Sequence, residues 1–274
     1  DEWAKTEVGR IGEERFRREY GCEFLVYDET LINSIKLSTL EGSDPSWNMG
    51  QTRWYGKPKS DCTYVIALDP SMGTGGDYAA IQVFELPSYK QIAEWRHNTT
   101  PIPSQIRILK DISVYIRDEC QNDGQNIYWS VENNSIGEGA LIVIRDMGEE
   151  NIPGMCVSEP MRKGRVRKFR KGFNTTHSTK ISACTRLKNM VETDRLKINS
   201  KILVSELKAF VASGSSYKAK PGETDDLVSA CLLSMRIMAV LKDWDPRVYE
   251  TFNQADTEED ITPPMPIFVS TNVR

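Results

Sequence analysis

Acidic residues stand at the ends of three separate apolar segments of this sequence, and this pattern limits the folds open to the chain. The acids concerned are Asp69, Glu132, Asp225 and Asp226. A carboxylate at the end of a buried strand costs free energy unless an opposite charge neutralises it. We therefore expect a fold that brings the three segment ends together, where one kind of positive partner can neutralise them all.

The chemistry of such an acid cluster favours a divalent metal ion. Mg²⁺ and Mn²⁺ prefer oxygen ligands, and carboxylates on three different elements can supply them. The sequence also contains a strongly basic stretch within residues 160–191. Metal-binding acids beside a basic segment are typical of phosphodiester chemistry on nucleic acids.

The positive charge of the chain is concentrated in this one stretch. The formal net charge is −4, from 35 Lys and Arg against 39 Asp and Glu. Residues 160–191 contain no acid and ten basic residues. The candidate nucleic-acid contacts among them are Arg162, Lys163, Arg165, Arg167, Lys168, Arg170, Lys171 and Lys180. A positive segment on an acidic protein favours binding to a polyanion, although charge runs often form only solvated surface.

Composition argues against several other classes of protein. The contents of hydrophobic residues (39%) and charged residues (27%) are ordinary for a soluble globular protein. No apolar run approaches the roughly 20 residues needed to cross a bilayer. The six cysteines form no C-x-x-C pair and there are only two histidines, so we do not expect a structural zinc site.

Hydrophobic periodicity predicts five strands and five helices after residue 57. The predicted strands are residues 62–69, 78–86, 90–98, 126–132 and 155–158. The predicted helices are residues 103–122, 137–147, 178–194, 201–211 and 224–242, the last with Thr224 as its N-cap. We interpret residues 1–57 as an N-terminal extension or linker with a short helix at 13–20, residues 58–243 as the main domain, and residues 244–274 as a C-terminal tail.

The order of these elements predicts a mixed sheet with helices on its faces. The short turn at residues 87–89 predicts an antiparallel hairpin of the second and third strands. A crossover connection between the first and fourth strands would make those two strands parallel. If they are also neighbours, Asp69 and Glu132 end at the same edge of the sheet.

Three motifs, in this order along the chain, resemble a known family. They are ALDPSMGTGGDYAAI, YWSVENN and GETDDLVSA. Together they are similar to the nuclease domain of the large terminase subunit of tailed bacteriophages, most closely of the T-even type, over residues 60–242. The terminal sequence PPMPIFVSTNVR is also similar to the tail of T-even-like terminases.

The resemblance implies an α/β fold of the RNase H-like (RuvC-like) kind, with a mixed central sheet flanked by helices. It implies that Asp69, Glu132 and Asp225 are the catalytic acids and ligands of two Mg²⁺ or Mn²⁺ ions, with Asp77 as a supporting ligand. The implied reaction is metal-dependent endonuclease cleavage of double-stranded viral DNA, with little sequence specificity, during genome packaging. The basic stretch would then bind the DNA backbone.

The resemblance also implies partners and a location. The partners are double-stranded DNA, the portal protein, the small terminase subunit and an ATPase domain of the same full-length chain. This sequence lacks the P-loop pattern G-x-x-x-x-G-K-[ST] and begins with Asp1 rather than Met, so we expect it to be the nuclease part alone. The implied location is the host cytoplasm at the procapsid portal, outside the mature virion and without a membrane.

Each candidate acid also has a purely structural explanation. Asp69 before a proline is a common turn former, and Asp77 follows a glycine-rich turn. Asp225 and Asp226 would stabilise a helix N-terminus without any further role. Adjacent helical residues point about 100° apart, so we expect one of the pair to face the site, and the resemblance selects Asp225.

Three other functions fit parts of the sequence. A phosphotransferase of the actin and sugar-kinase kind shares the core fold, but it needs a second, duplicated domain. A non-catalytic DNA-gripping or docking module of a packaging motor would bind DNA without cutting it. Another RNase H-like nuclease, such as a junction resolvase or an integrase, would prefer branched or end-specific DNA.

Overall fold

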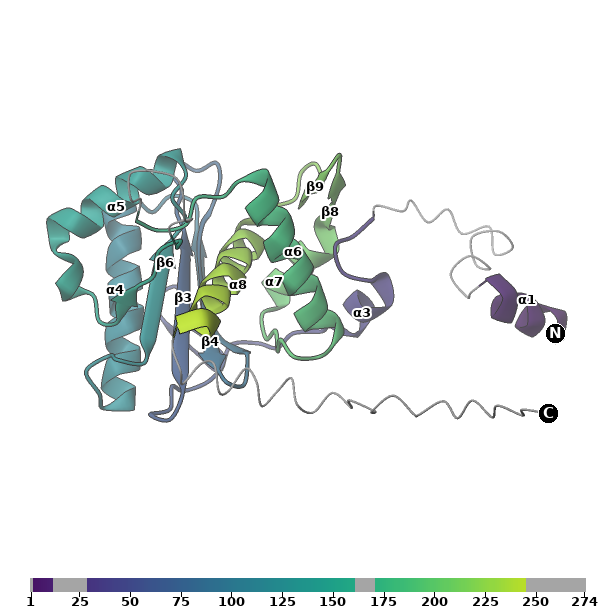
Figure 1. The fold of residues 1–274 in the computed structure, drawn as a ribbon, viewed down its shortest axis with the longest axis horizontal. Coiled ribbons are helices and arrows are strands. Elements are labelled where there is room, and N and C mark those ends of the chain that lie inside the picture. The colour runs from purple at the N-terminus through teal and green to yellow at the C-terminus, as the bar shows by residue number, and fades with distance from the viewer. Residues whose placement is uncertain (1, 12–28, 161–170, 245–274) are drawn as a thin grey trace, which may run out of the picture.

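The computed structural model describes residues 2–11, 29–160 and 171–244 (Figure 1). The predicted short helix at residues 13–20, the basic residues from Arg162 to Arg170 and the C-terminal tail lie outside the described residues.

A seven-stranded sheet forms the centre of the described structure, in the order β1-β2-β5-β4-β3-β6-β7. The pairs β3–β6 and β6–β7 are parallel and the other pairs are antiparallel. The strands are β1 (Trp47–Met49), β2 (Thr52–Trp54), β3 (Thr63–Asp69), β4 (Ala79–Leu86), β5 (Lys90–His97), β6 (Ile127–Val131) and β7 (Met155–Cys156). The predicted mixed α/β sheet and the parallel pairing of the first and fourth predicted strands are confirmed.

Helices cover both faces of this sheet (Figure 1). On one face lie α4 (Ile102–Cys120) and α5 (Ser135–Met147), and on the other α6 (His177–Glu192), α7 (Lys201–Ala209) and α8 (Asp226–Trp244). The remaining elements are α1 (Glu2–Ile11), α3 (Ser34–Thr39), η1 (Glu149–Asn151) and the hairpin of β8 (Phe210–Ser213) and β9 (Ser216–Ala219). No helix among the described residues has the length and apolar character to cross a bilayer.

The central strands are continuous apolar runs because both of their faces are covered. Along β3, Tyr64, Ile66 and Leu68 belong to the core under α4 and α5, whereas Val65 and Ala67 belong to the core under α6, α7 and α8. This alternation is the period of two that a strand imposes on its side chains. The sheet therefore separates two apolar cores.

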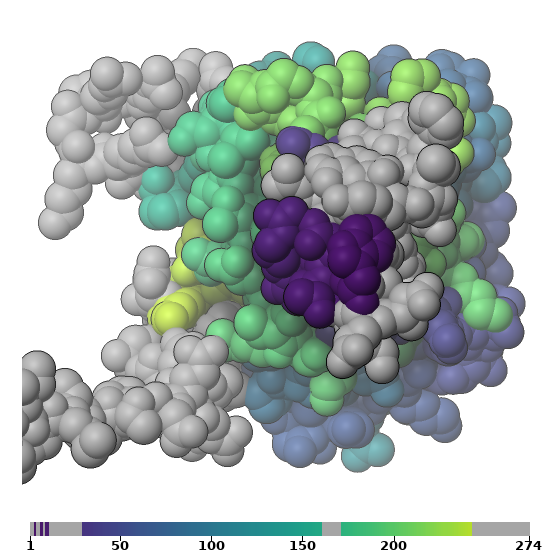
Figure 2. Space-filling model, turned by 90° about the vertical axis from the view of Figure 1, so that its right-hand side faces the viewer, coloured from purple at the N-terminus to yellow at the C-terminus, as the bar shows by residue number. Residues whose placement is uncertain are grey.

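Figure 2 faces the side of the molecule where α6 and the β8–β9 hairpin lie next to each other at the surface. His177, at the start of α6, forms a hydrogen bond of 2.9 Å with the backbone oxygen of Ser215 at the hairpin tip. Behind this tip, the rings of Phe210 and Tyr217 stack with their centroids 6.1 Å apart. The hairpin is thus held against the helical layer that contains α8.

The segment expected to be an N-terminal extension contributes to this sheet. β2 pairs with β5, and Trp54 is fully buried and stacks on Trp47 with 5.8 Å between ring centroids. Leu31 and Ile32, earlier still, are buried in the core beside α6, α7 and α8. Within the described residues, the apolar core therefore already includes Leu31, well before residue 58.

The last helix begins two residues later than predicted. Its first residue is Asp226, and the backbone oxygen of Asp225 accepts from the amide of Ser229 at 2.8 Å. The predicted N-cap, Thr224, is wrong, because its hydroxyl donates to Glu206 on α7 at 3.2 Å instead of binding an amide of α8. Asp225 therefore stands at the point where the chain enters the helix.

Candidate functional site

Asp69 and Glu132 lie side by side at the carboxyl ends of two neighbouring parallel strands. Leu68 of β3 pairs with Val131 of β6, and the amide of Glu132 donates to the backbone oxygen of Leu68 at 3.0 Å. Asp69 is the last residue of β3, and Glu132 follows β6 directly. The register thus places both acids at one edge of the sheet, as the sequence predicted for neighbouring parallel strands.

Strand alternation also places both acids on the same face. Val65 and Ala67 share the core that contains α8, and Asp69 follows at the same spacing of two. On β6, Tyr128 belongs to that core while Trp129 and Val131 belong to the other. Glu132 therefore continues the α8 side of β6.

The chain turns sharply after Glu132 into α5. Asn134 caps this helix, because its side-chain oxygen accepts from the amides of Ile136 (3.0 Å) and Gly137 (2.9 Å). A Cβ atom at Gly137 would lie 1.8 Å from the backbone oxygen of Glu132, so only glycine allows so close a return. This tight turn fixes the backbone that positions Glu132.

The N-terminus of α8 brings further acids to this face. α8 contacts β3, β4 and β6. The Asp225 carboxylate accepts from the amide of Ala219 in β9 at 3.2 Å, which links it to the hairpin. Asp226 opens the helix, where a negative charge is favoured by the helix dipole.

The pKa of Asp69 shows that these acids act on one another. Burial raises the pKa of Asp69 well above its ordinary value, and the charge and hydrogen bond of Glu132 raise it further. The charges of Asp226 and then Asp225 add to the same effect. Burial also raises the pKa of Asp226 to about 6, although the nearby charge of Arg96 opposes this shift. The acids from three elements therefore surround Asp69 with negative charge.

Asp226 raises the pKa of Asp69 more than Asp225 does, although the resemblance selected Asp225. Asp77 is exposed in the turn before β4, and its charge contributes to the raised pKa of Asp226. The structure thus brings Asp69, Glu132, Asp225 and Asp226 into one electrostatic cluster, with Asp77 at its margin.

The donor chemistry of this cluster fits a hard divalent cation. All candidate ligands are carboxylate oxygens, and the groups that most strongly affect Asp69 are acids rather than bases. In the described residues, no group of three His, Cys, Asp or Glu side chains is already gathered closely enough to hold a metal ion. Instead, Glu132 shares a hydrogen bond with Asp69, and Asp225 bonds to Ala219. An incoming cation would have to exchange these contacts for its own.

Two basic residues of the predicted nucleic-acid segment are described. Lys171 is exposed and forms an ion pair with Glu149. Lys180, in the first turn of α6, places its ammonium 5.6 Å from the ring centroid of Phe210, within the range of a cation–π contact. Neither has an acid of the cluster as an ion-pair partner among the described residues.

Sequence reasoning missed Arg96 and Glu206, which adjoin the cluster. Arg96 on β5 and Glu206 on α7 form an ion pair of 2.8 Å, and both side chains are largely buried. One signal was present: Glu206 occupies an inward position among Leu203, Val204 and Leu207, where helical periodicity predicts an apolar residue.

Comparison with known proteins identifies the family. Residues 66–237, more than half of the chain, match the family described as "Terminase RNaseH-like domain". The chain belongs to this terminase RNase H-like family. The matched range contains all four acids of the cluster and Asp77.

Solved structures of this kind have the same fold. The large terminase nuclease from thermophilic phage G20c, with bound magnesium, is 18% identical, with a TM-score of 0.56 over 76% of this chain and 96% of that chain. The large terminase nuclease domain of Thermus phage P74-26 is 19% identical, with a TM-score of 0.52 over 73% of this chain and 91% of that chain. The RNase H-like fold is therefore confirmed, whereas the closer similarity to T-even phages stays a prediction.

Proposed function

We propose that this chain is a metal-dependent endonuclease that cuts double-stranded DNA during viral genome packaging. The observation that carries the proposal is the convergence of Asp69, Glu132 and the start of α8 at one edge of the sheet, with a strongly raised pKa at Asp69. Membership of the terminase RNase H-like family supports it. So do the G20c nuclease structures, which are described with bound magnesium and with bound cobalt.

In this proposal Asp69, Glu132 and Asp225 are the ligands of two Mg²⁺ or Mn²⁺ ions, and Asp77 supports them. When bound, such ions supply an activated water and stabilise the charge on the leaving 3′ oxygen. Asp69 stands at the end of a central strand, where it shares a hydrogen bond with Glu132 and is affected by the charges of Asp226 and Asp225. Asp226 adds negative charge that strengthens cation binding.

The residues of the chain would also orient the DNA. The seven basic residues from Arg162 to Lys171, together with Lys180, would contact backbone phosphates, which fix position without reading sequence. The described residues that follow this stretch lie close to the acid cluster. The amide of Phe173 donates to the backbone oxygen of Val131, the residue before Glu132, at 3.2 Å. Low sequence specificity follows, since phosphate contacts carry no base information.

The wider setting belongs to the same proposal. We propose that residues 1–57 follow an ATPase domain of a longer chain and contribute β1 and β2 to the sheet of the nuclease domain, residues 58–243, and that residues 244–274 form a tail. The partners would be double-stranded DNA, the portal protein and the small terminase subunit, in the cytoplasm of the infected host and without a membrane.

A plasmid-cleavage experiment tests the nuclease. The chain is incubated with supercoiled plasmid and Mg²⁺ or Mn²⁺, with an EDTA control and the Asp69→Ala variant alongside. We expect nicked and linear DNA only with metal and the unaltered chain. Cutting in EDTA, or equal cutting by the variant, would reject the proposal. DNA binding without any cutting would favour the gripping module instead.

A further inference from the structure

Glu206 is a buried carboxylate whose partners flank the acids of α8. It is 4% exposed, and such a group costs free energy unless it is hydrogen-bonded and paired. Its Oε1 atom accepts from Arg96 Nη1 at 2.8 Å and from the Thr224 hydroxyl at 3.2 Å. Its Oε2 atom accepts from the amide of Val228 at 3.1 Å.

Two of these contacts bracket the acid pair Asp225-Asp226. Thr224 precedes the pair, and the amide of Val228 lies in the first turn of α8, where backbone N–H groups lack helical partners. One carboxylate on α7 therefore fixes the chain just before and just after the two acids. It satisfies an unpaired amide of α8 and sets how that helix starts relative to the sheet.

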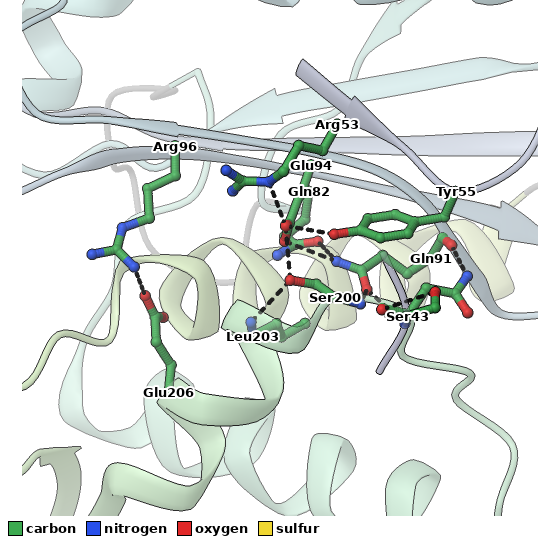
Figure 3. A network of polar contacts seen from close by, with 11 residues as sticks. Ser43, Arg53, Tyr55, Gln82, Gln91, Glu94, Arg96, Ser200, Leu203 and Glu206 are labelled. Atoms are coloured by element: carbon green, nitrogen blue, oxygen red, sulfur yellow. Dashed lines mark hydrogen bonds and ion pairs between the residues drawn. The ribbon is translucent and has the colours of Figure 1, made fainter. Parts of the chain in front are cut away.

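Arg96 connects Glu206, with its contacts to Thr224 and Val228, to the rest of the site (Figure 3). It extends from β5 to Glu206, and its guanidinium lies 3.8 Å from the ring centroid of Tyr78, which follows Asp77. The charge of Arg96 also acts on Asp226. The pair thus joins β5, α7, the start of β4 and the start of α8 at one point.

From this geometry we infer that the Arg96–Glu206 pair is a positioning device that sets the affinity of the acid cluster for divalent cations. Neither residue contacts the reacting atoms; both act by fixing the start of α8 relative to Asp69 and Glu132. Groups that orient metal ligands in this way typically change metal affinity by about 10- to 100-fold when they are removed. The inference depends on the proposed metal site.

The matched control is Glu94, a second buried glutamate. It is fully buried on β5, two residues from Arg96, and accepts from Arg53 (2.9 Å), Tyr55 (2.8 Å) and Ser200 (2.7 Å). Ser200 caps α7, at the end of that helix away from Glu206 (Figure 3). Glu94→Gln therefore removes a buried negative charge without touching the start of α8.

The test is a Mn²⁺ titration of the full chain, with free Mn²⁺ measured by electron paramagnetic resonance and folding checked by circular dichroism. We expect Glu206→Gln to weaken Mn²⁺ binding by about 10- to 100-fold, and Glu94→Gln to leave it within about twofold. Thr224→Val, which removes a single donor to Glu206, should show a smaller loss and gives a readout if Glu206→Gln does not fold.

The outcomes separate the inference from the proposed function. Unchanged Mn²⁺ affinity in both Glu206→Gln and Thr224→Val, or an equal loss in Glu94→Gln, would overturn the positioning role alone. An unaltered chain that binds no Mn²⁺ would overturn the metal site and with it this inference. Weaker Mn²⁺ binding in Glu206→Gln and Thr224→Val, but not in Glu94→Gln, would establish the positioning role.

Discussion

Two carboxylates on the same face of one sheet have opposite surroundings. Glu94 is fully buried, yet Arg53, Tyr55 and Ser200 all donate to its Oε1 atom, and Gln91 donates to Oε2 at 3.3 Å. Asp69 ends β3, which lies two strands from β5 in the sheet, and the groups that act on it most strongly are acids. Within the described residues, Glu94 is thus bonded to donors, whereas Asp69 is influenced mainly by other acids.

This difference indicates which carboxylate serves the fold and which serves a ligand. A buried charge with a full set of donors keeps its place in the absence of any other molecule. A cluster of acids with raised pKa values destabilises the protein by itself, and such clusters are found where function requires them. The contrast therefore assigns Glu94 to the architecture and supports the cation binding proposed for the Asp69 cluster.

The sharpest way to break this contrast is Asp69→Asn, which keeps the side-chain shape and removes its charge. If Asp69 is a metal ligand, we expect plasmid cleavage to fall by at least about 1,000-fold, because metal positioning and charge stabilisation are lost together. The metal-free variant should melt at the same or a higher temperature than the unaltered chain at pH 8, since one repulsive charge has gone. A lower melting temperature with intact cleavage would assign Asp69 to the fold.

The opposite change is Glu94→Ala, which should damage the fold. Its removal leaves Arg53, Tyr55 and Ser200 without their shared acceptor, and breaking a buried pair of this kind costs about 2–4 kcal/mol, given that Arg53 is partly in water. Urea denaturation measures this loss. Mn²⁺ affinity of the folded fraction should stay unchanged. A loss below about 0.5 kcal/mol would show that the network contributes little.

The sequence predicted the two central strands and the acids at their ends, but it did not predict the buried network around Glu94. The apolar runs before Asp69 and Glu132 placed two buried strands within a residue or two of their positions. The acids stood out because each interrupts or ends an apolar run. Asp226 could not be separated from Asp225 by sequence, because which neighbour faces the sheet depends on where α8 begins, and Thr224 suggested the wrong start.

The remaining features depend on contacts between distant residues. Arg96 and Glu206 are 110 positions apart, and no local pattern connects them. β1 and β2 have three residues each, too few to show a period of two, so the sheet extends into a segment that we expected to be a linker. Glu94 lies between Ala93 and Trp95 on β5, and two of its donors, Arg53 and Ser200, are 41 and 106 positions away in the sequence.

A pH titration of stability measures the raised pKa values of the buried acids. Burial raises the pKa of Glu206 from 4.5 to about 7 and that of Asp226 from 3.8 to about 6. The folded chain therefore holds protons that the unfolded chain releases, so its stability should fall as pH rises from about 4.5 to 7. In EDTA we expect a loss of about 1–3 kcal/mol between pH 5 and pH 7.5.

Two controls identify the groups responsible for this loss. Glu206→Gln should reduce the loss of stability with rising pH, because it removes one of the titrating groups. Saturating Mn²⁺ should increase the stability at pH 7.5, because it neutralises the acids. A stability that rises over this pH range in EDTA, in both the unaltered chain and the variant, would contradict the raised pKa values.

The last prediction tests whether Mn²⁺ binding by the acid cluster and DNA binding by the basic stretch are independent. If the basic stretch holds phosphates and does not serve the acid cluster, then Arg165→Gln, Arg167→Gln and Lys168→Gln together should weaken DNA binding by about tenfold or more. They should also reduce the salt dependence, the slope of log K against log [salt], by about 2–3.

The matched control replaces the exposed residues Lys57, Lys59 and Arg107 by glutamine. Mn²⁺ affinity should not change in either triple variant. A loss of Mn²⁺ affinity in the variant of the basic stretch alone would mean that this stretch also shapes the acid cluster. An equal loss of DNA binding in both triple variants would mean that the basic stretch contributes only net charge.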